Sequence, residues 1–73
     1  MQTLVFNTTA KTVKVYEGAA EKSELNYQYD FVPTVKIMEG YYEVMQTDKM
    51  TDEEKRYPVA RFPITNTNMI LKK

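Results

Sequence analysis

The sequence predicts a mainly β fold, built as one small domain over residues 1–73. Short segments in which apolar and polar residues alternate recur along the chain, with turn-forming residues between them. Residues 19–24 include helix formers but span less than two turns, too short for a stable isolated helix. We therefore expect a single small antiparallel sheet or a five- to six-stranded, partly closed barrel with meander connectivity. At most one short helix is expected, near residues 52–57.

The central segment, residues 35–45, predicts a hairpin that turns at Glu39-Gly40. Folded there, one face pairs Ile37 with Tyr42 and Val35 with Val44, whereas the other pairs Lys36 with Glu43 and Met38 with Tyr41. A slip of one residue would scatter the apolar side chains over both faces, so burial and charge together predict this register. The turn is less ideal, because only Gly40 accepts a positive φ at low cost and a type I′ turn needs two such residues.

Residues 3–6 and 11–16 predict a first hairpin, joined by a turn at residues 7–10. A four-residue turn sets Leu4 opposite Val13, with Phe6 and Val15 on the same apolar face. The other face is mostly polar: it carries Thr3, Val5, Thr12, Lys14 and Tyr16. We expect this hairpin to be solvated on one side.

Residues 25–31 show the cleanest alternation in the chain. One predicted face is apolar and consists of Leu25, Tyr27, Tyr29 and Phe31. Pro33 ends the strand on one side, because proline donates no backbone hydrogen bond. Since the central hairpin follows at once, we expect these three strands to form a continuous antiparallel meander.

The C-terminal third is less regular. Thr51 and Glu54 have the spacing of a helix capping box, so residues 48–56 predict one or two helical turns or a long charged loop. Residues 58–64 are extended but contain two prolines, which predicts an edge strand or a crossing segment. Residues 65–68 have the composition of a turn, and residues 69–71 predict a last short strand.

Composition excludes several classes of function. The chain has no cysteine and no histidine, which removes disulfides, a structural zinc site and nucleophilic catalysis with a histidine base or a cysteine. The ten basic and ten acidic residues balance, which argues against binding to duplex DNA. The strand carboxylates Asp30 and Glu43 are interpreted as surface groups, Glu43 with Lys36 as its cross-strand partner. We expect no enzyme, no cofactor and no metal.

Length and hydropathy bear on assembly and location. No apolar run approaches the length of a membrane span and the first residues lack signal-peptide character, so we expect a cytoplasmic protein without membrane contact. A domain of this size has a small core, and such domains commonly gain further stability from disulfides, a metal or self-association. Of these three, the composition leaves self-association open.

Six residues are candidates for contact with a partner or ligand. Met38, Tyr41 and Met45 lie opposite the predicted core face and form an apolar patch, which another subunit, another protein or the rest of a closed barrel would cover. Arg61 lies between two prolines and is suited to hold a carboxylate or phosphate, unless it forms an ordinary salt bridge with the acidic loop. Tyr57 and Asn66 would complete such a site.

Three functions remain, in order of preference. The first is a non-enzymatic protein-binding module, an inhibitor or accessory subunit that self-associates through a sheet face or edge. The second is an oligomeric binder of a small anionic ligand such as a nucleotide, with the ligand at a subunit interface. The third is binding of single-stranded nucleic acid on an aromatic sheet face.

Overall fold

The computed structural model describes residues 1–48 and 55–73, and the mainly β class is confirmed. In these residues the strands are β1 (Gln2–Asn7), β2 (Thr12–Glu17), β3 (Glu24–Tyr29), β4 (Thr34–Ile37), β5 (Tyr41–Gln46), β6 (Tyr57–Pro63) and β7 (Thr67–Lys72), with the 3-10 turn η2 (Ile64–Asn66) before β7. The first half of the helix expected near residues 52–57 falls on residues 52–54, which lie outside the described part of the chain. Tyr57, at its predicted end, belongs to β6.

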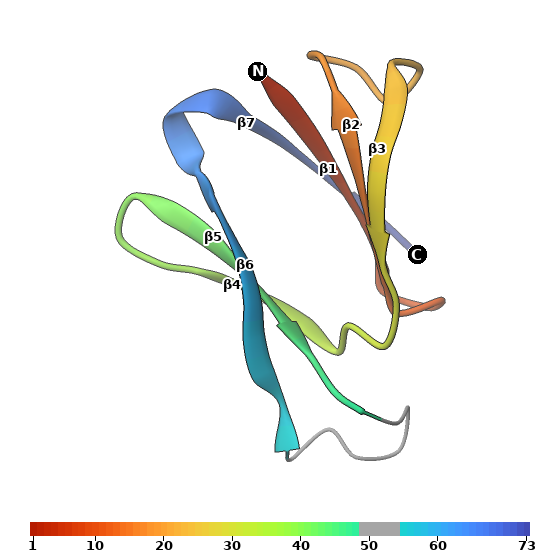
Figure 1. The fold of residues 1–73 in the computed structure, drawn as a ribbon, viewed down its shortest axis with the longest axis vertical. Coiled ribbons are helices and arrows are strands. Elements are labelled where there is room, and N and C mark those ends of the chain that lie inside the picture. Colours follow the sequence, from red (N-terminus) through yellow and green to blue (C-terminus); the bar gives the residue numbers. More distant parts are fainter. Residues whose placement is uncertain (49–54) are drawn as a thin grey trace.

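The strands form two sheets rather than the single sheet or five- to six-stranded barrel expected from the sequence (Figure 1). Sheet A has the order β3-β2-β1-β7, and sheet B has the order β4-β5-β6. β1 and β7 run parallel, and the other pairs are antiparallel. The chain passes from sheet A to sheet B after β3 and returns through η2.

The predicted pairing of the third strand with the central hairpin is wrong, because the chain turns away after Asp30. Phe31 adopts a left-handed backbone with φ of 57°, and the next residue, Val32, is wholly buried in the core. This crossing segment is held to both sheets. The Val32 amide donates to the carbonyl of Lys11, in the loop just before β2 of sheet A, at 2.8 Å, and the Phe31 carbonyl accepts from the amide of Thr47, just beyond β5 of sheet B, at 2.9 Å.

The register of the central hairpin is confirmed at every predicted ladder pair. Ile37 lies opposite Tyr42, Lys36 opposite Glu43 and Val35 opposite Val44. The Met38 amide donates to the Tyr41 carbonyl at 2.9 Å and closes the turn. Gly40 has φ of 87°, and Glu39 has no positive φ, so the turn is not type I′.

The first hairpin forms, but its predicted register is wrong by two residues. Phe6 lies opposite Val13 and Leu4 opposite Val15. The loop occupies residues 8–11, because the Asn7 side-chain oxygen accepts from the amides of Thr9 and Ala10 at 3.1 and 2.9 Å. A shift of two residues preserves the faces of both strands, so the apolar set still points into the core.

The strict alternation expected for residues 25–31 is broken by a bulge. Tyr27 lies opposite Val15, but Leu25 lies opposite Tyr16, so β3 contributes one extra residue, Asn26, at this point. Leu25 is therefore paired with the polar-face residue Tyr16, while Tyr27 is paired with a core residue. The predicted four-residue apolar face does not form.

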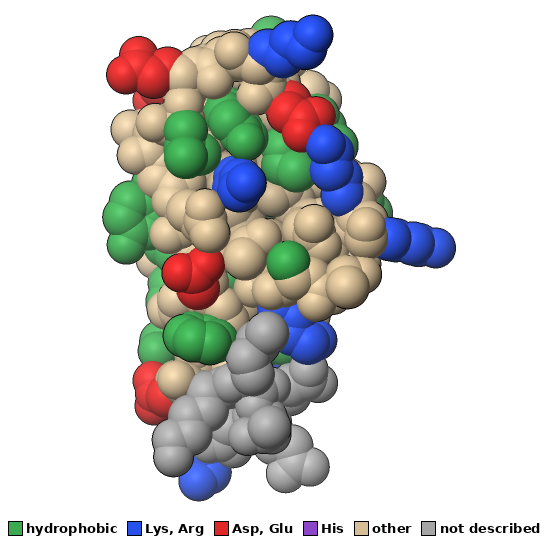
Figure 2. Space-filling model, turned by 90° about the vertical axis from the view of Figure 1, so that its right-hand side faces the viewer, with side chains coloured by type: hydrophobic (Ala, Val, Ile, Leu, Met, Phe, Trp, Pro, Cys, Tyr) green, Lys and Arg blue, Asp and Glu red, His purple; other side chains and the backbone are tan. Residues whose placement is uncertain are grey.

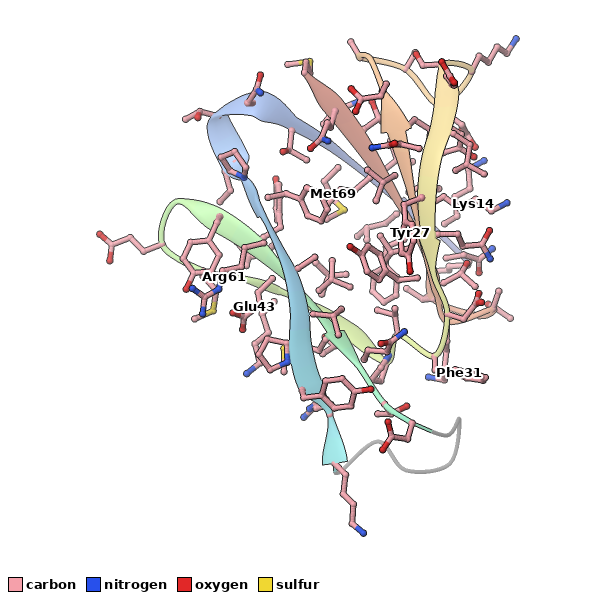
Figure 3. The ribbon with its side chains drawn as sticks, viewed as in Figure 1. Lys14, Tyr27, Phe31, Glu43, Arg61 and Met69 are labelled. Carbon is pink, nitrogen blue, oxygen red and sulfur yellow. The ribbon has the colours of Figure 1, made fainter. Side chains whose placement is uncertain are left out.

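The core lies between the two sheets. Its buried residues are Leu4, Phe6, Val13 and Val15 from sheet A, Val32 from the crossing segment and Val44 from sheet B. Partly buried side chains extend it from β5, β6 and β7, among them Met69, which points into the space between the sheets in Figure 3. Ile37, on the apolar face of the central hairpin, is 75% exposed and lies beyond the core.

The C-terminal strands agree in part with the sequence. β6 lies at the edge of sheet B and carries both prolines, as predicted for residues 58–64. The last strand begins at Thr67, two residues earlier than expected, and the predicted turn is the 3-10 turn η2.

Candidate functional site

The face of sheet B that points away from sheet A carries a buried carboxylate and an exposed guanidinium (Figure 3). Glu43 and Arg61 are cross-strand partners on β5 and β6. The Arg61 Nε donates to Glu43 Oε2 at 2.8 Å, while the side chains are 64% and 8% exposed, respectively. Glu43 is buried because β5 is the central strand of the sheet, with a neighbour on each side.

Arg61 also covers an aromatic ring. Its guanidinium carbon lies 5.0 Å from the centroid of the Tyr41 ring, a distance typical of a cation–π contact. The hydrogen bond to Glu43 raises the pKa of Arg61, as do its electrostatic interactions with Tyr41 and Glu43. The register sets Lys36 opposite Glu43 as expected, yet in the described part of the chain the ion pair of Glu43 is with Arg61.

The predicted patch of Met38, Tyr41 and Met45 is not a continuous exposed surface. Met45 is only 5% exposed, because it lies between Thr34 of β4 and Pro58 of β6, next to a bulge at which β6 contributes the extra residue Val59. Tyr41 is partly buried and contacts Arg61, and Met38 is 38% exposed. Of the three, Met38 alone offers an exposed apolar side chain.

Tyr57 and Asn66 lie apart from Arg61. The Tyr57 hydroxyl donates to Asp48 Oδ1 at 2.9 Å, and this hydrogen bond raises the pKa of Tyr57, with smaller contributions from burial and from the Asp48 charge. Tyr57 and Arg61 are four residues apart on β6, which is about 13 Å along a strand. Asn66 is exposed in η2, beyond the other end of β6. The structure therefore brings together Tyr41 and Arg61, but not the full predicted set.

Sequence reasoning missed a hollow on the outer face of sheet A. It has a volume of about 360 Å³ and is lined by Val5, Asn7, Ala10, Thr12, Lys14, Tyr16, Glu21, Gln28 and Lys72. The signal was present in the alternation of Thr12, Lys14 and Tyr16 on the polar face of β2. Figure 2 views the molecule from the side of sheet A, where side chains of both charges and apolar side chains are interspersed.

A shallower hollow of about 350 Å³ follows β6 and is lined by Pro58, Val59, Ala60 and Arg61.

Within residues 1–48 and 55–73, no three acidic side chains gather where they could hold a metal ion. None of the helical segments described is long and apolar enough to cross a membrane.

The free edge of β3 is the most exposed strand edge of the described chain. β3 ends sheet A, and five of its six residues are exposed. Tyr27 is 57% exposed although it extends from the core-facing side of β3, and its ring centroid lies 4.6 Å from that of Tyr29 in an edge-to-face pair. Burial raises the pKa of Tyr29, and the neighbouring Tyr27 raises it further.

The chain matches no family model, no curated protein and no solved structure.

Proposed function

We propose that the chain is a non-enzymatic protein-binding module that self-associates by pairing β3 of one copy with β3 of a second copy. The observation that carries this proposal is the open edge of β3 with the exposed Tyr27. An unpaired strand edge presents backbone donors and acceptors that bind another strand.

The other edges of the two sheets are better protected against strand addition. β6 contains Pro58 and Pro63, which cannot donate to a new ladder. β4 has only four residues, and β7 carries the basic residue Lys72. β3 has six residues and contains neither proline nor a basic residue. Its one irregularity, the bulge at Asn26, leaves residues 27–29 regularly paired.

A two-fold axis at Gln28 gives the best antiparallel register for this regular part. It sets Tyr27 against Tyr29 of the second copy, so the two edge-to-face pairs would join into a cluster of four rings. Asn26 would oppose Asp30, and no two like charges would face each other. Two-fold symmetry is also the commonest symmetry of homo-oligomers, and a domain with so small a core gains most from such an interface.

The alternatives from the sequence have less support. Arg61, the predicted anion-binding residue, already donates to Glu43. An aromatic platform for single-stranded nucleic acid needs several rings on one exposed face. The aromatic side chains are divided instead: Tyr27 and Tyr29 are on the core side of sheet A, Tyr16 is on its outer face, and Tyr41 is on the outer face of sheet B.

Sedimentation equilibrium tests the proposal with two matched variants. Tyr27→Lys adds a positive charge at the β3 edge, and Ile37→Lys adds the same charge at an exposed apolar position of sheet B. We expect the unmodified chain and Ile37→Lys to form dimers and Tyr27→Lys to be monomeric, with all three equally folded by circular dichroism. A chain that stays monomeric at concentrations up to about 1 mM would contradict the proposal. A Kd of that size corresponds to an association free energy of only roughly −4 kcal/mol. Equal loss of the dimer in both variants would contradict it as well.

A further inference from the structure

We propose a second site in the hollow on the outer face of sheet A, argued from different observations than self-association. The site would bind a small organic anion, a carboxylate or a phosphomonoester, with Lys14 as the cation that holds the anionic group. This placement differs from the sequence prediction, in which Arg61 on the other sheet held the anion.

The hollow is built from regular structure rather than from one loop. β1 supplies Val5 and Asn7, β2 supplies Thr12, Lys14 and Tyr16, and β3 and β7 supply Gln28 and Lys72. Residues two apart on a strand share a face, so the three side chains from β2 point to the same side of the sheet. Figure 3 shows Lys14 projecting from the side of sheet A that faces away from sheet B. A volume of about 360 Å³ is at the lower end of the range for ligand sites, which suits a small molecule.

Lys14 is the cation of this hollow that lacks a carboxylate partner in the described chain. The register sets Val5 on one side of it and Gln28 on the other, neither of them acidic. Among the described residues, the ion pairs join Arg61 to Glu43 and Lys72 to Glu21, and no carboxylate pairs with Lys14. Lys14 is also partly buried, and a partly desolvated ammonium group gains more from an anionic partner than one in open water does.

The rest of the lining agrees with an anionic ligand. Its two lysines and one glutamate give a net charge of +1, because Lys72 is neutralised by Glu21. The hydroxyls of Thr12 and Tyr16, on either side of Lys14 along β2, can donate hydrogen bonds to carboxylate or phosphate oxygens. The Tyr16 ring and Val5 offer apolar contact for the body of the ligand. A charged head bound at Lys14 and a compact body against Tyr16 define the ligand class.

This site can be tested by titrating the chain with three matched small molecules and following the backbone amide chemical shifts by NMR. Phenyl phosphate and benzoate carry the two anionic groups on the same ring, and benzyl alcohol is their uncharged counterpart. We expect saturable shifts for one or both anions, centred on the amides of Thr12, Lys14, Tyr16 and Gln28, and none for benzyl alcohol. Saturation by phenyl phosphate alone would assign the site to phosphomonoesters, and saturation by benzoate alone would assign it to carboxylates.

Two lysine variants separate a specific site from general attraction to positive charge. Lys14→Gln and Lys36→Gln remove the same charge, but Lys36 is exposed on the other sheet. We expect Lys14→Gln to weaken anion binding at least about tenfold, since hydrogen bonds to charged groups are stronger than neutral ones. Lys36→Gln should leave binding unchanged. Equal weakening in both variants, no saturable shift at the lining amides, or equal binding of benzyl alcohol would overturn the proposal.

Discussion

Glu43 and Arg61 lie directly opposite each other on β5 and β6, joined by a hydrogen bond of 2.8 Å between Arg61 Nε and Glu43 Oε2. The pair is asymmetric, because the carboxylate is 8% exposed and the guanidinium side chain is 64% exposed. The two residues therefore depend on each other unequally. Glu43 loses its hydrogen-bond donor when Arg61 is removed, whereas Arg61 stays solvated when Glu43 is neutralised.

This asymmetry predicts unequal effects of substitution on stability. Glu43→Gln should change the free energy of unfolding by no more than about 1 kcal/mol, because it leaves no charge buried. Arg61→Ala should lower the urea midpoint further, because it leaves a buried carboxylate without its hydrogen-bond donor. Lys36→Ala is the control, since the described residues contain no ion pair between Lys36 and Glu43. Equal midpoints for Arg61→Ala and Lys36→Ala would show that the cross-strand pair does not support Glu43.

The crossing between the sheets predicts a reversal of the usual ranking of alanine and glycine. Phe31 has φ of 57°, a region that costs residues with a Cβ roughly 1–2 kcal/mol and glycine nothing. Phe31→Ala and Phe31→Gly both remove the ring, so their difference isolates the backbone. We expect Phe31→Gly to be the more stable by about 1 kcal/mol in urea denaturation. A more stable alanine variant would mean that residue 31 relaxes to a negative φ.

The central hairpin could be predicted from the sequence because its two faces differ chemically and its turn is short. Any other register would have put Lys36 or Glu43 among apolar partners. The same logic could have found β6: a third strand that sets Phe62 against Tyr42 and Ala60 against Val44 also sets Arg61 against Glu43. The prolines of residues 58–64 correctly predicted an edge but gave no register.

The arrangement in two sheets could not be predicted in this way. The alternation of residues 25–31 is equally compatible with pairing back to β2 or onward to β4. Two features decide between these pairings: the left-handed backbone at Phe31 and the burial of Val32. The sequence does not reveal the left-handed backbone, because an aromatic residue rarely adopts it. The parallel pairing of β1 with β7 joins residues more than sixty positions apart and has no local signature. The hollow around Lys14 depends on that pairing, since β7 supplies Lys72 to its lining.

The position of the core between the sheets predicts that alanine substitutions at two leucines will lower the free energy of unfolding by very different amounts. Leu4 is wholly buried between Val15 and Met69, whereas Leu71 is 68% exposed on β7. Leu4→Ala should lower the free energy of unfolding by about 2–5 kcal/mol, which is comparable to the whole contribution expected of so small a core. Leu71→Ala should change it by no more than about 0.5 kcal/mol. Similar urea midpoints for the two variants would place Leu4 outside the core.

The hydrogen bond from Tyr57 to Asp48 predicts that the Tyr57 hydroxyl loses its proton at a higher pH than an ordinary tyrosine. This bond raises the pKa of Tyr57 above its usual 10.0, so the folded chain keeps this proton at a pH where the unfolded chain has lost it. The associated stability is complete below about pH 10, where both states are protonated, and it is lost as the pH rises through the pKa of the folded state. Asp48→Asn removes the carboxylate acceptor, so one tyrosine should ionise at lower pH when absorbance at 295 nm is followed. Tyr57→Phe should remove the same late step from the titration. Identical titration curves for Asp48→Asn and the unmodified chain would show that the bond does not hold the phenol proton.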